Sequence, residues 1–135
     1  MHIRSVLLVI VPAMFIARAS HGESEGAKER RARTACLAGN YTEGVRLLSE
    51  LFVATMNETY VFDQGRCFQQ NGRYEDAITR FREYLRVGQQ IKKAYKAKAE
   101  KHIEDCTAQL QRERAAATPV AVPPAPPPVA AAPPS

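Results

Sequence analysis

The sequence predicts an all-α protein, an α-solenoid of two helix hairpins followed by a C-terminal capping helix. Three observations predict it. Apolar residues between residues 23 and 114 recur at helical spacing, and the alternation typical of strands is missing. Two segments, LAGNYTEGVRLL and QNGRYEDAITRF, share one frame of residues and lie 33 residues apart. A repeat of about that length is typical of stacked helix hairpins, because a single hairpin cannot bury its own apolar face.

Residues 1–19 are typical of a secretory signal peptide. Arg4 supplies a positive charge, residues 5–16 form an almost unbroken apolar run, and residues 17–19 (Ala-Arg-Ala) form a small-x-small cleavage pattern. A membrane-spanning helix needs about 20 apolar residues, whereas this run is shorter and contains Pro12. We therefore expect cleavage after Ala19 and a secreted or periplasmic protein. The alternative is an uncleaved membrane anchor.

Repeat 1 is expected over about residues 25–57 and holds two helices. The first, over residues 23–38, is rich in Ala, Glu, Lys and Arg, which are good helix formers. Gly39-Asn40 ends it, because glycine permits a tight turn that other residues resist. The second helix begins at Tyr41, runs to about residue 54 and carries its apolar residues on one face.

Repeat 2 is expected over about residues 58–89 in the same order. A helix over residues 58–70 follows Asn57, a residue type that caps helices, and Asn71-Gly72 ends it. The next helix runs from Tyr74 to Val87. The small residue of the shared frame lets the two helices of a hairpin approach closely. The recurring positions are Gly39, Tyr41 and Gly44 in repeat 1, and Gly72, Tyr74 and Ala77 in repeat 2.

A fifth helix is expected over about residues 90–114, with one narrow apolar stripe and charged residues on its other faces. A helix of this kind at the end of a repeat array covers the last repeat and shows its polar side to water. The alternative use of its lysine-rich face is contact with anionic lipid or cell-wall polymer. The stripe consists of Ile91, Tyr95, Ala99, Ile103, Cys106 and Leu110.

Residues 115–135 contain eight Ala, eight Pro and three Val and carry no charged side chain. Proline fixes φ and removes backbone donors, so neither a helix nor a sheet is expected there. The composition predicts a disordered, polyproline-like and semi-rigid spacer. Two alternatives remain open, a tail without a task and a ligand for a proline-binding groove.

Over roughly residues 23–110 the chain resembles the tetratricopeptide repeat (TPR) family. The segment VFDQGRCFQQNGRYEDAITRFREYL fits well, with a small residue at Gly65 and an aromatic residue at Phe68 in the first helix. Repeat 1 departs from the pattern, since Ala35 takes the aromatic place and Gly44 replaces the usual Ala. The spacing is also one residue short of the usual length. The turn and second-helix positions that fit are Gly72, Tyr74, Ala77, Phe81 and Leu85.

The resemblance implies a right-handed solenoid that binds a peptide or protein segment on its concave face, which the first helix of each repeat lines. Arg33 and Arg66 occupy equivalent places and would lie side by side, an arrangement that suits a carboxylate or an acidic peptide. The alternative is that both are solvated surface residues. The implied groove residues are Glu29, Arg33 and Leu37 from repeat 1, with Phe62, Arg66 and Gln69 from repeat 2.

The chain has three cysteines, Cys36, Cys67 and Cys106, and the signal peptide directs them to an oxidising compartment. None has the spacing of a metal site, and no cofactor is expected. Cys67 is expected to face the neighbouring unit, and Cys106 lies on the inward stripe of the capping helix. The sequence therefore favours a Cys67–Cys106 disulfide that leaves Cys36 over. The alternative is three buried thiols without a bridge.

Composition argues against catalysis and against nucleic-acid binding. After the leader the chain carries 17 basic and 14 acidic residues, a small excess for a nucleic-acid partner. No nucleophile stands near an evident base, and no glycine loop suits a phosphate. The expected function is therefore a non-enzymatic adaptor of the bacterial periplasm or cell envelope. A structural spacer or assembly subunit tethered by the tail is the alternative, and two repeats fall below the usual three, which favours a partnered or oligomeric state.

Overall fold

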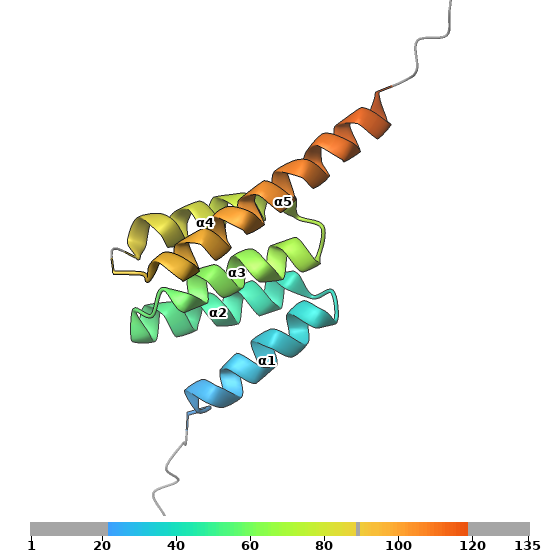
Figure 1. Ribbon diagram of the computed structural model, residues 1–135. Coiled ribbons are helices and arrows are strands. Elements are labelled where there is room, and N and C mark those ends of the chain that lie inside the picture. Colours follow the sequence, from blue (N-terminus) through green and yellow to red (C-terminus); the bar gives the residue numbers. More distant parts are fainter. Residues whose placement is uncertain (1–21, 89, 119–135) are drawn as a thin grey trace, which may run out of the picture.

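The computed structural model describes residues 22–88 and 90–118, and over this part of the chain the protein is all-α (Figure 1). Strands do not occur among these residues, so the predicted fold class is confirmed at the level of secondary structure. The expected signal peptide, its expected cleavage site and residues 119–135 lie outside the described residues. The helices are α1 (Glu25–Leu37), α2 (Tyr41–Thr55), α3 (Thr59–Gln70), α4 (Tyr74–Val87) and α5 (Lys93–Ala117).

The fifth helix differs from the expectation at both ends. It begins at Lys93 because the backbone of Lys92 is extended, and it continues three residues past Arg114, through alanines that the sequence placed in the tail. Alanine is the best helix former, and the first proline after the leader comes only at residue 119. The residue before a proline is disfavoured in a helix, and Thr118 is indeed extended, with φ −74° and ψ 117°.

The turns inside the two hairpins have the same backbone conformation, 33 residues apart. Gly39 and Gly72 adopt positive φ values of 86° and 69°. The residues that follow them, Asn40 and Arg73, have φ/ψ values of −88°/63° and −90°/65°. Only glycine adopts such positive φ values without strain, so the recurring glycine is a requirement of the turn. The same hydrogen bond closes both turns, donated by Asn40 N to Ala35 O and by Arg73 N to Phe68 O.

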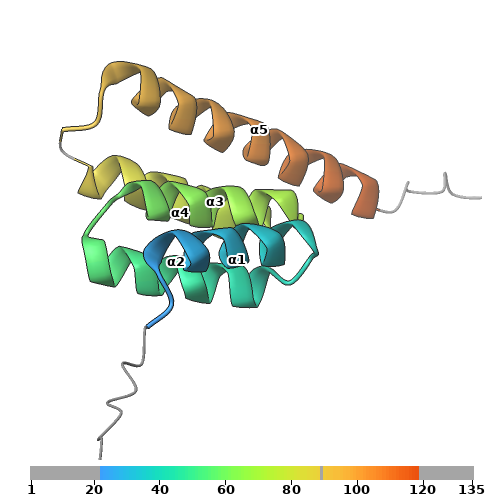
Figure 2. The same ribbon diagram turned by 90° about the horizontal axis from the view of Figure 1, so that it is seen from below.

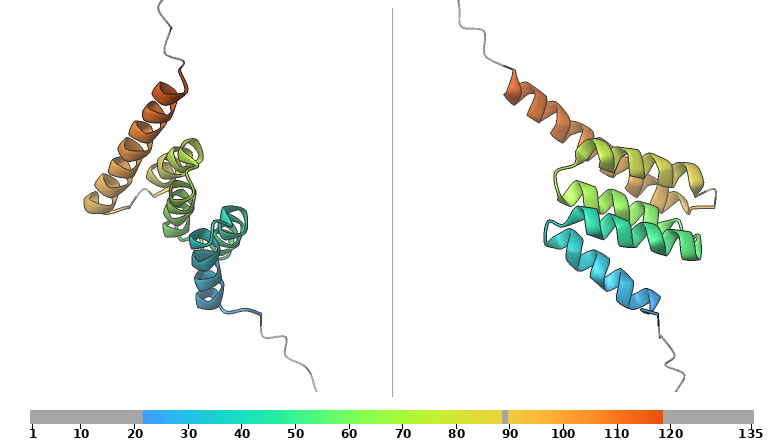
Figure 3. Two further views of the ribbon diagram at one scale, coloured as in Figure 1. Left: turned by 90° about the vertical axis from the view of Figure 1, so that its right-hand side faces the viewer. Right: turned by 180° about the vertical axis from the view of Figure 1, so that it is seen from behind.

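The helices pack as hairpins that follow one another in chain order. Helix α1 packs on α2, α3 packs on α4, α2 joins the two hairpins by packing on α3, and α5 packs on α4. Figure 2 shows the α1–α2 hairpin, the α3–α4 hairpin and α5 as successive layers. The other two views agree, and they place α5 and α1 on opposite sides of the α3–α4 hairpin (Figure 3). Each hairpin thus covers an apolar face of the next.

Of the nine predicted signature residues, four are buried, three are half-buried and two are exposed. Gly44, Gly65, Ala77 and Phe81 are buried, and a side chain at Gly65 would meet the ring of Phe81, with Cβ only 2.7 Å from Cε1. Gly39 and Gly72 are exposed in the turns. The half-buried aromatic members pack against the core clusters from their edges; these are Tyr41, Phe68 and Tyr74.

One residue of the expected inward stripe is misplaced. Tyr95 is 55% exposed, whereas Ile91 and Ala99 are buried in one cluster with Tyr84. Because the chain is extended at Lys92, Ile91 does not stand one helical turn before Tyr95. Ile91 fills the apolar space at the end of α4, and the ring of Tyr95 is left beside a cavity.

Candidate functional site

Two adjoining cavities of about 320 and 500 Å³ lie along α3, between α1 on one side and α5 on the other. Phe62, Asp63 and Lys98 line both cavities, so the two form one continuous depression, called here the inner groove. The smaller cavity lies between α1 and α3, and the larger one between α3 and α5. Helices α1, α3 and α5 are the first helices of their units, which is the side where the resemblance placed the binding face.

Five of the six expected groove residues line the smaller cavity. The sixth, Gln69, lies outside its lining and accepts a hydrogen bond of 3.1 Å from Arg66 Nη1. Helical periodicity explains this outcome, because the five lie on the faces of α1 and α3 that turn toward each other, and Gln69 lies beyond that face. The five are Glu29, Arg33, Leu37, Phe62 and Arg66.

Both arginines of the inner groove already have neighbours. The exposed Arg33 pairs with Glu29, Nη2 to Oε1 at 3.4 Å, and a surface pair of this kind contributes little to stability. Arg66 contacts His102 on α5, with Nη1 3.3 Å from Nδ1, in addition to its bond to Gln69. The prediction of an acidic ligand relied on two adjacent guanidinium groups, and these two groups are engaged with neighbours in the unliganded chain.

An acidic side chain also lies where the two cavities meet. Asp63 is half-buried, and burial raises the pKa of its carboxyl, with a further rise from Glu29 and an opposing effect of Arg33, Arg66 and Lys98. Over its whole length the inner groove carries nearly equal numbers of acidic and basic side chains. They are Glu29, Glu58 and Asp63 against Arg33, Arg66, Lys92 and Lys98.

Three aromatic residues, Phe62, Tyr84 and Tyr95, line the larger cavity. The ring centroid of Phe62 lies 5.3 Å from those of Phe81 and Tyr84 and 5.5 Å from that of His102. His102 stacks on Phe81 at 5.0 Å. No sequence pattern identified a partner for His102. Its place one residue before Ile103 of the apolar stripe was the available signal that it faces α3.

We expect His102 to titrate below its ordinary value of 6.5. Burial lowers its pKa most, followed by the charge of Arg66, with Lys98 and Lys101 adding to the effect and Asp105 opposing it. Because the folded pKa is depressed, the unfolded chain binds more protons just below pH 6.5, and stability is lost as pH falls through that window.

The titration is measured by following the His102 ring signals by NMR, with the urea-unfolded chain as the reference. Replacing Arg66 by Gln should raise the pKa of His102, because it removes the nearest positive charge. A His102 pKa that is the same in the folded and unfolded chains and does not respond to Arg66→Gln would contradict the contact between α3 and α5.

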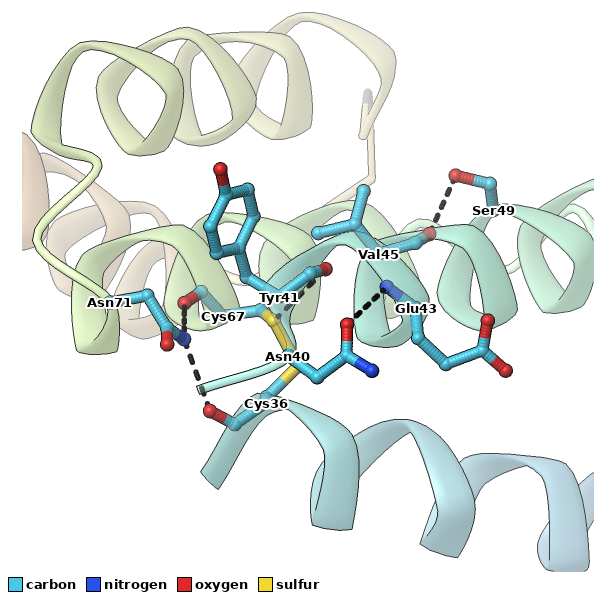
Figure 4. The surroundings of a disulfide bond; sticks show 8 residues. All are labelled: Cys36, Asn40, Tyr41, Glu43, Val45, Ser49, Cys67 and Asn71. Atoms are coloured by element: carbon cyan, nitrogen blue, oxygen red, sulfur yellow. Dashed lines mark hydrogen bonds between the residues drawn. A yellow bond between two sulfur atoms is a disulfide. The ribbon is translucent and has the colours of Figure 1, made fainter. Parts of the chain in front are cut away.

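Helix α1 is attached to α3 at both of its ends. At the first, Tyr60 donates its hydroxyl to Glu25 Oε1 at 2.8 Å, and this bond together with burial raises the pKa of Tyr60 to about 12. At the second, a disulfide joins Cys36 to Cys67. Asn71 Nδ2 also donates to the backbone carbonyls of both cysteines, at 3.0 and 2.7 Å (Figure 4). The α1 wall of the inner groove is therefore fixed.

The expected Cys67–Cys106 disulfide is wrong, as is the expectation that Cys36 is left over. Cys67 points toward α1 and α2, and its Cα lies 5.2 Å from that of Cys36. Cys106 is a buried free thiol between α4 and α5, packed with Ala77 and Phe81, and burial raises its pKa. The two sulfur atoms that the sequence paired thus belong to different core clusters.

The Cys36–Cys67 disulfide explains why residue 44 is glycine. A Cβ atom there would overlap the sulfur of Cys36 and come within 3.1 Å of the sulfur of Cys67. The disulfide therefore takes the space that an alanine side chain at this position would fill. A glycine at the small position of only one repeat, in a chain with two cysteines near that level, indicates the bridge.

The described residues contain no cluster suited to a metal ion, and the comparisons with known proteins found no match. Within residues 22–88 and 90–118, His, Cys, Asp and Glu side chains nowhere gather in threes in a way that would hold a metal ion. Among the same residues, each helix is too short or too polar to cross a membrane. The chain matched no protein-family model, no curated protein and no solved structure. The fold and the inner groove define an all-α chain of helix hairpins with one elongated depression.

Proposed function

We propose that this chain is a non-enzymatic scaffold of the bacterial periplasm or cell envelope that binds an extended peptide segment in the inner groove. The observation that carries the proposal is the groove itself, a pair of cavities about 320 and 500 Å³ in volume that share three residues. A right-handed solenoid of TPR type is part of the same proposal. It is supported by two hairpin turns of equal backbone conformation, 33 residues apart.

The dimensions and chemistry of the inner groove suit a short extended peptide. Its lining runs from Glu58 to Gln70 along α3, which is about 18 Å at 1.5 Å per residue and spans about five extended residues. Phe62 and Tyr95 offer rigid apolar surface, and Arg33, Arg66 and Lys98 can donate to peptide carbonyls. Aromatic anchors among polar groups are the usual composition of a peptide-binding surface.

The disulfide supports the proposed compartment. Disulfides persist in oxidising surroundings such as the periplasm and are rare in the cytosol. The Cys36–Cys67 bridge is nearly inaccessible, with the two residues 6% and 1% exposed, which is the character of a structural bridge. Together with the leader sequence, it favours an exported protein.

The alternative, a spacer or assembly subunit with the tail as tether, is favoured by the far end of α5. Residues 111–118 are all exposed, and this end of the helix extends beyond α4 toward the tail (Figure 1). Under this alternative the inner groove has no ligand, and the length of residues 119–135 is what matters.

The groove is tested by selecting peptides that bind the chain from a displayed random library and mapping them by NMR. We expect the shifted amides to lie along α1, α3 and α5. Arg33→Glu with Arg66→Glu should weaken binding about tenfold or more, because two donors to the peptide are replaced by acceptors. The matched control, Arg82→Glu with Arg86→Glu on α4, has the same charge change and should bind normally.

The fold of each variant is checked by circular dichroism, because Arg66 also contacts α5. Equal binding by both double variants, or shifts confined to the outer surfaces of α2 and α4, would contradict the proposal. Loss of assembly on removal of residues 119–135, with no peptide bound in any variant, would favour the spacer.

A further inference from the structure

The larger cavity of the inner groove is aromatic, nearly neutral and unfilled by the described residues. Phe62, Tyr84 and Tyr95 supply three aromatic rings, and Ile91 adds an apolar side chain. Its charged lining residues balance, two acidic against two basic: Glu58, Asp63, Lys92 and Lys98. A charged ligand would therefore be repelled by two of these side chains and attracted by the other two, whereas an uncharged ligand would not be repelled.

Proline-rich segments are one class of peptide that aromatic-lined grooves bind. Proline fixes φ, so such a segment loses little conformational entropy on binding, and its rings pack flat against aromatic faces. The carbonyl groups of a proline-rich segment keep no internal hydrogen bonds and accept from donors on the rim. Lys92, Lys98 and Tyr95 are among the lining residues of the larger cavity whose side chains can donate such bonds.

The chain itself carries such a segment at a matching distance. Residues 119–135 hold eight of the nine prolines and no charge. They begin directly after Thr118, at the end of α5 that extends past the α3–α4 hairpin (Figure 1). The described residues thus end past the groove, on the same helix that lines it, and a proline-rich segment without charged side chains follows.

The length of that segment is sufficient to fill the groove from end to end. Helix α5 lies beside α3 in register, since Lys98 sits over the ring of Phe62 at 5.6 Å and His102 contacts Arg66. The distance from Thr118 back to Lys98 is 20 residues of helix, about 30 Å. Seventeen residues at 3.1 Å each reach about 53 Å. After a turn, Pro126–Pro128 would come level with Phe62.

We propose that residues 119–135 fold back and occupy the inner groove of their own chain, with the prolines against Phe62, Tyr84 and Tyr95. The inference rests on the groove of the proposed function and names a competitor for its ligand. Tethering raises the local concentration of the segment to the millimolar range, so even a weak contact fills the groove. An external peptide then binds only by displacing the tail.

The test uses the chain from Ser20 to Ser135 with a nitroxide attached after Ser135→Cys, in a Cys106→Ala background that leaves one free thiol. We expect the strongest broadening of amide signals at Thr59 and Tyr95, at the far end of the groove. Thr79, exposed on α4, serves as the unaffected reference. The matched control replaces Pro126, Pro127 and Pro128 by serine, which preserves length and charge, and should move the strongest broadening to the end of α5.

A mixed sample shows whether the tail in the groove comes from the same chain or from a second copy. It contains nitroxide-bearing chains without isotope label and isotope-labelled chains without nitroxide. Broadening at Thr59 that persists in the mixture would assign the groove to a second copy and overturn the proposal. Broadening greatest near Arg114 in both the proline and the serine chains would overturn it too.

The affinity of the peptides selected in the test of the proposed function is a second, independent measure of whether the tail occupies the groove. If the tail competes, the serine chain binds these peptides several-fold more tightly than the proline chain. Equal, groove-mapped binding by both chains would reject the tail as occupant and leave the proposed function intact. Absence of any groove-mapped peptide, together with a free tail, would reject both.

Discussion

Replacing Cys36 and Cys67 by serine is expected to lower the free energy of unfolding by about 3–4 kcal/mol. The disulfide joins two residues that are 31 positions apart in the chain. A cross-link that closes a loop of this length lowers the entropy of the unfolded chain, and the expected stabilisation is about 3–4 kcal/mol. Domains of this size have only about 5–15 kcal/mol of stability in total. The change is therefore a large share of what keeps this short array folded.

The measurement is urea unfolding followed by circular dichroism, with and without reductant. The native chain should lose stability on reduction, and the double serine variant should be unaffected by reductant. Cys106→Ala is the matched control, because Cys106 is a free thiol, and it should keep the full response to reductant. A response that disappears in Cys106→Ala would mean that Cys106 forms the bridge, contrary to the structure.

Hydrogen exchange locates the effect. Helix α1 is held to α3 by the disulfide, by Asn71 and by the Tyr60–Glu25 hydrogen bond. On reduction we expect the amides of α1 to exchange faster by a larger factor than those of α3 and α4, because only α1 loses its covalent attachment. Uniform acceleration across all helices would contradict a local role for the bridge.

Gly44→Ala is expected to destabilise the oxidised chain by about 1–2 kcal/mol. In an ordinary helix interior, alanine is better than glycine by about 1 kcal/mol. Here the added methyl group overlaps the disulfide and lies 3.1 Å from Ala32 O, and overpacking of this kind costs about 1–3 kcal/mol. In the double serine variant most of the overlap is gone, so the effect should shrink to about zero or become stabilising.

A double-mutant cycle measures the difference between the two backgrounds. Gly26→Ala on α1 is the control, because its Cβ would meet only the flexible Arg30 side chain, at 3.6 Å. That substitution should have the same small effect whether or not the disulfide is present. Equal effects of Gly44→Ala in both backgrounds would show that the disulfide is not what excludes a side chain at this position.

The repeated frame of residues made the helices and the turns of both hairpins predictable from the sequence. The glycine of each turn and the small residue of each second helix are local requirements, so Gly39, Gly72 and Ala77 could be placed from spacing alone. These features depend on residues close together in the chain, which is why a pattern records them. The resemblance, not the periodicity, placed Arg33 and Arg66 in one groove, and both line the smaller cavity.

The features that were missed depend on how helices are rotated against one another. Cys67 lies on the face of α3 that meets α1 and α2, and periodicity alone does not say which neighbouring helix that face meets. His102 faces α3 only because α5 lies in register with it. The start of α5 was missed because the extended backbone at Lys92 has no composition that marks it.

The two sides of the inner groove differ in how firmly they are held. A covalent bond and hydrogen bonds at both ends hold α1 against α3, whereas α5 reaches α3 only through side-chain contacts such as Arg66–His102 and otherwise rests on α4. If the inner groove binds a peptide as proposed, a bulky ligand should displace α5 and leave α1 in place. The width of the ligand should then be limited strictly beside α1 and loosely beside α5.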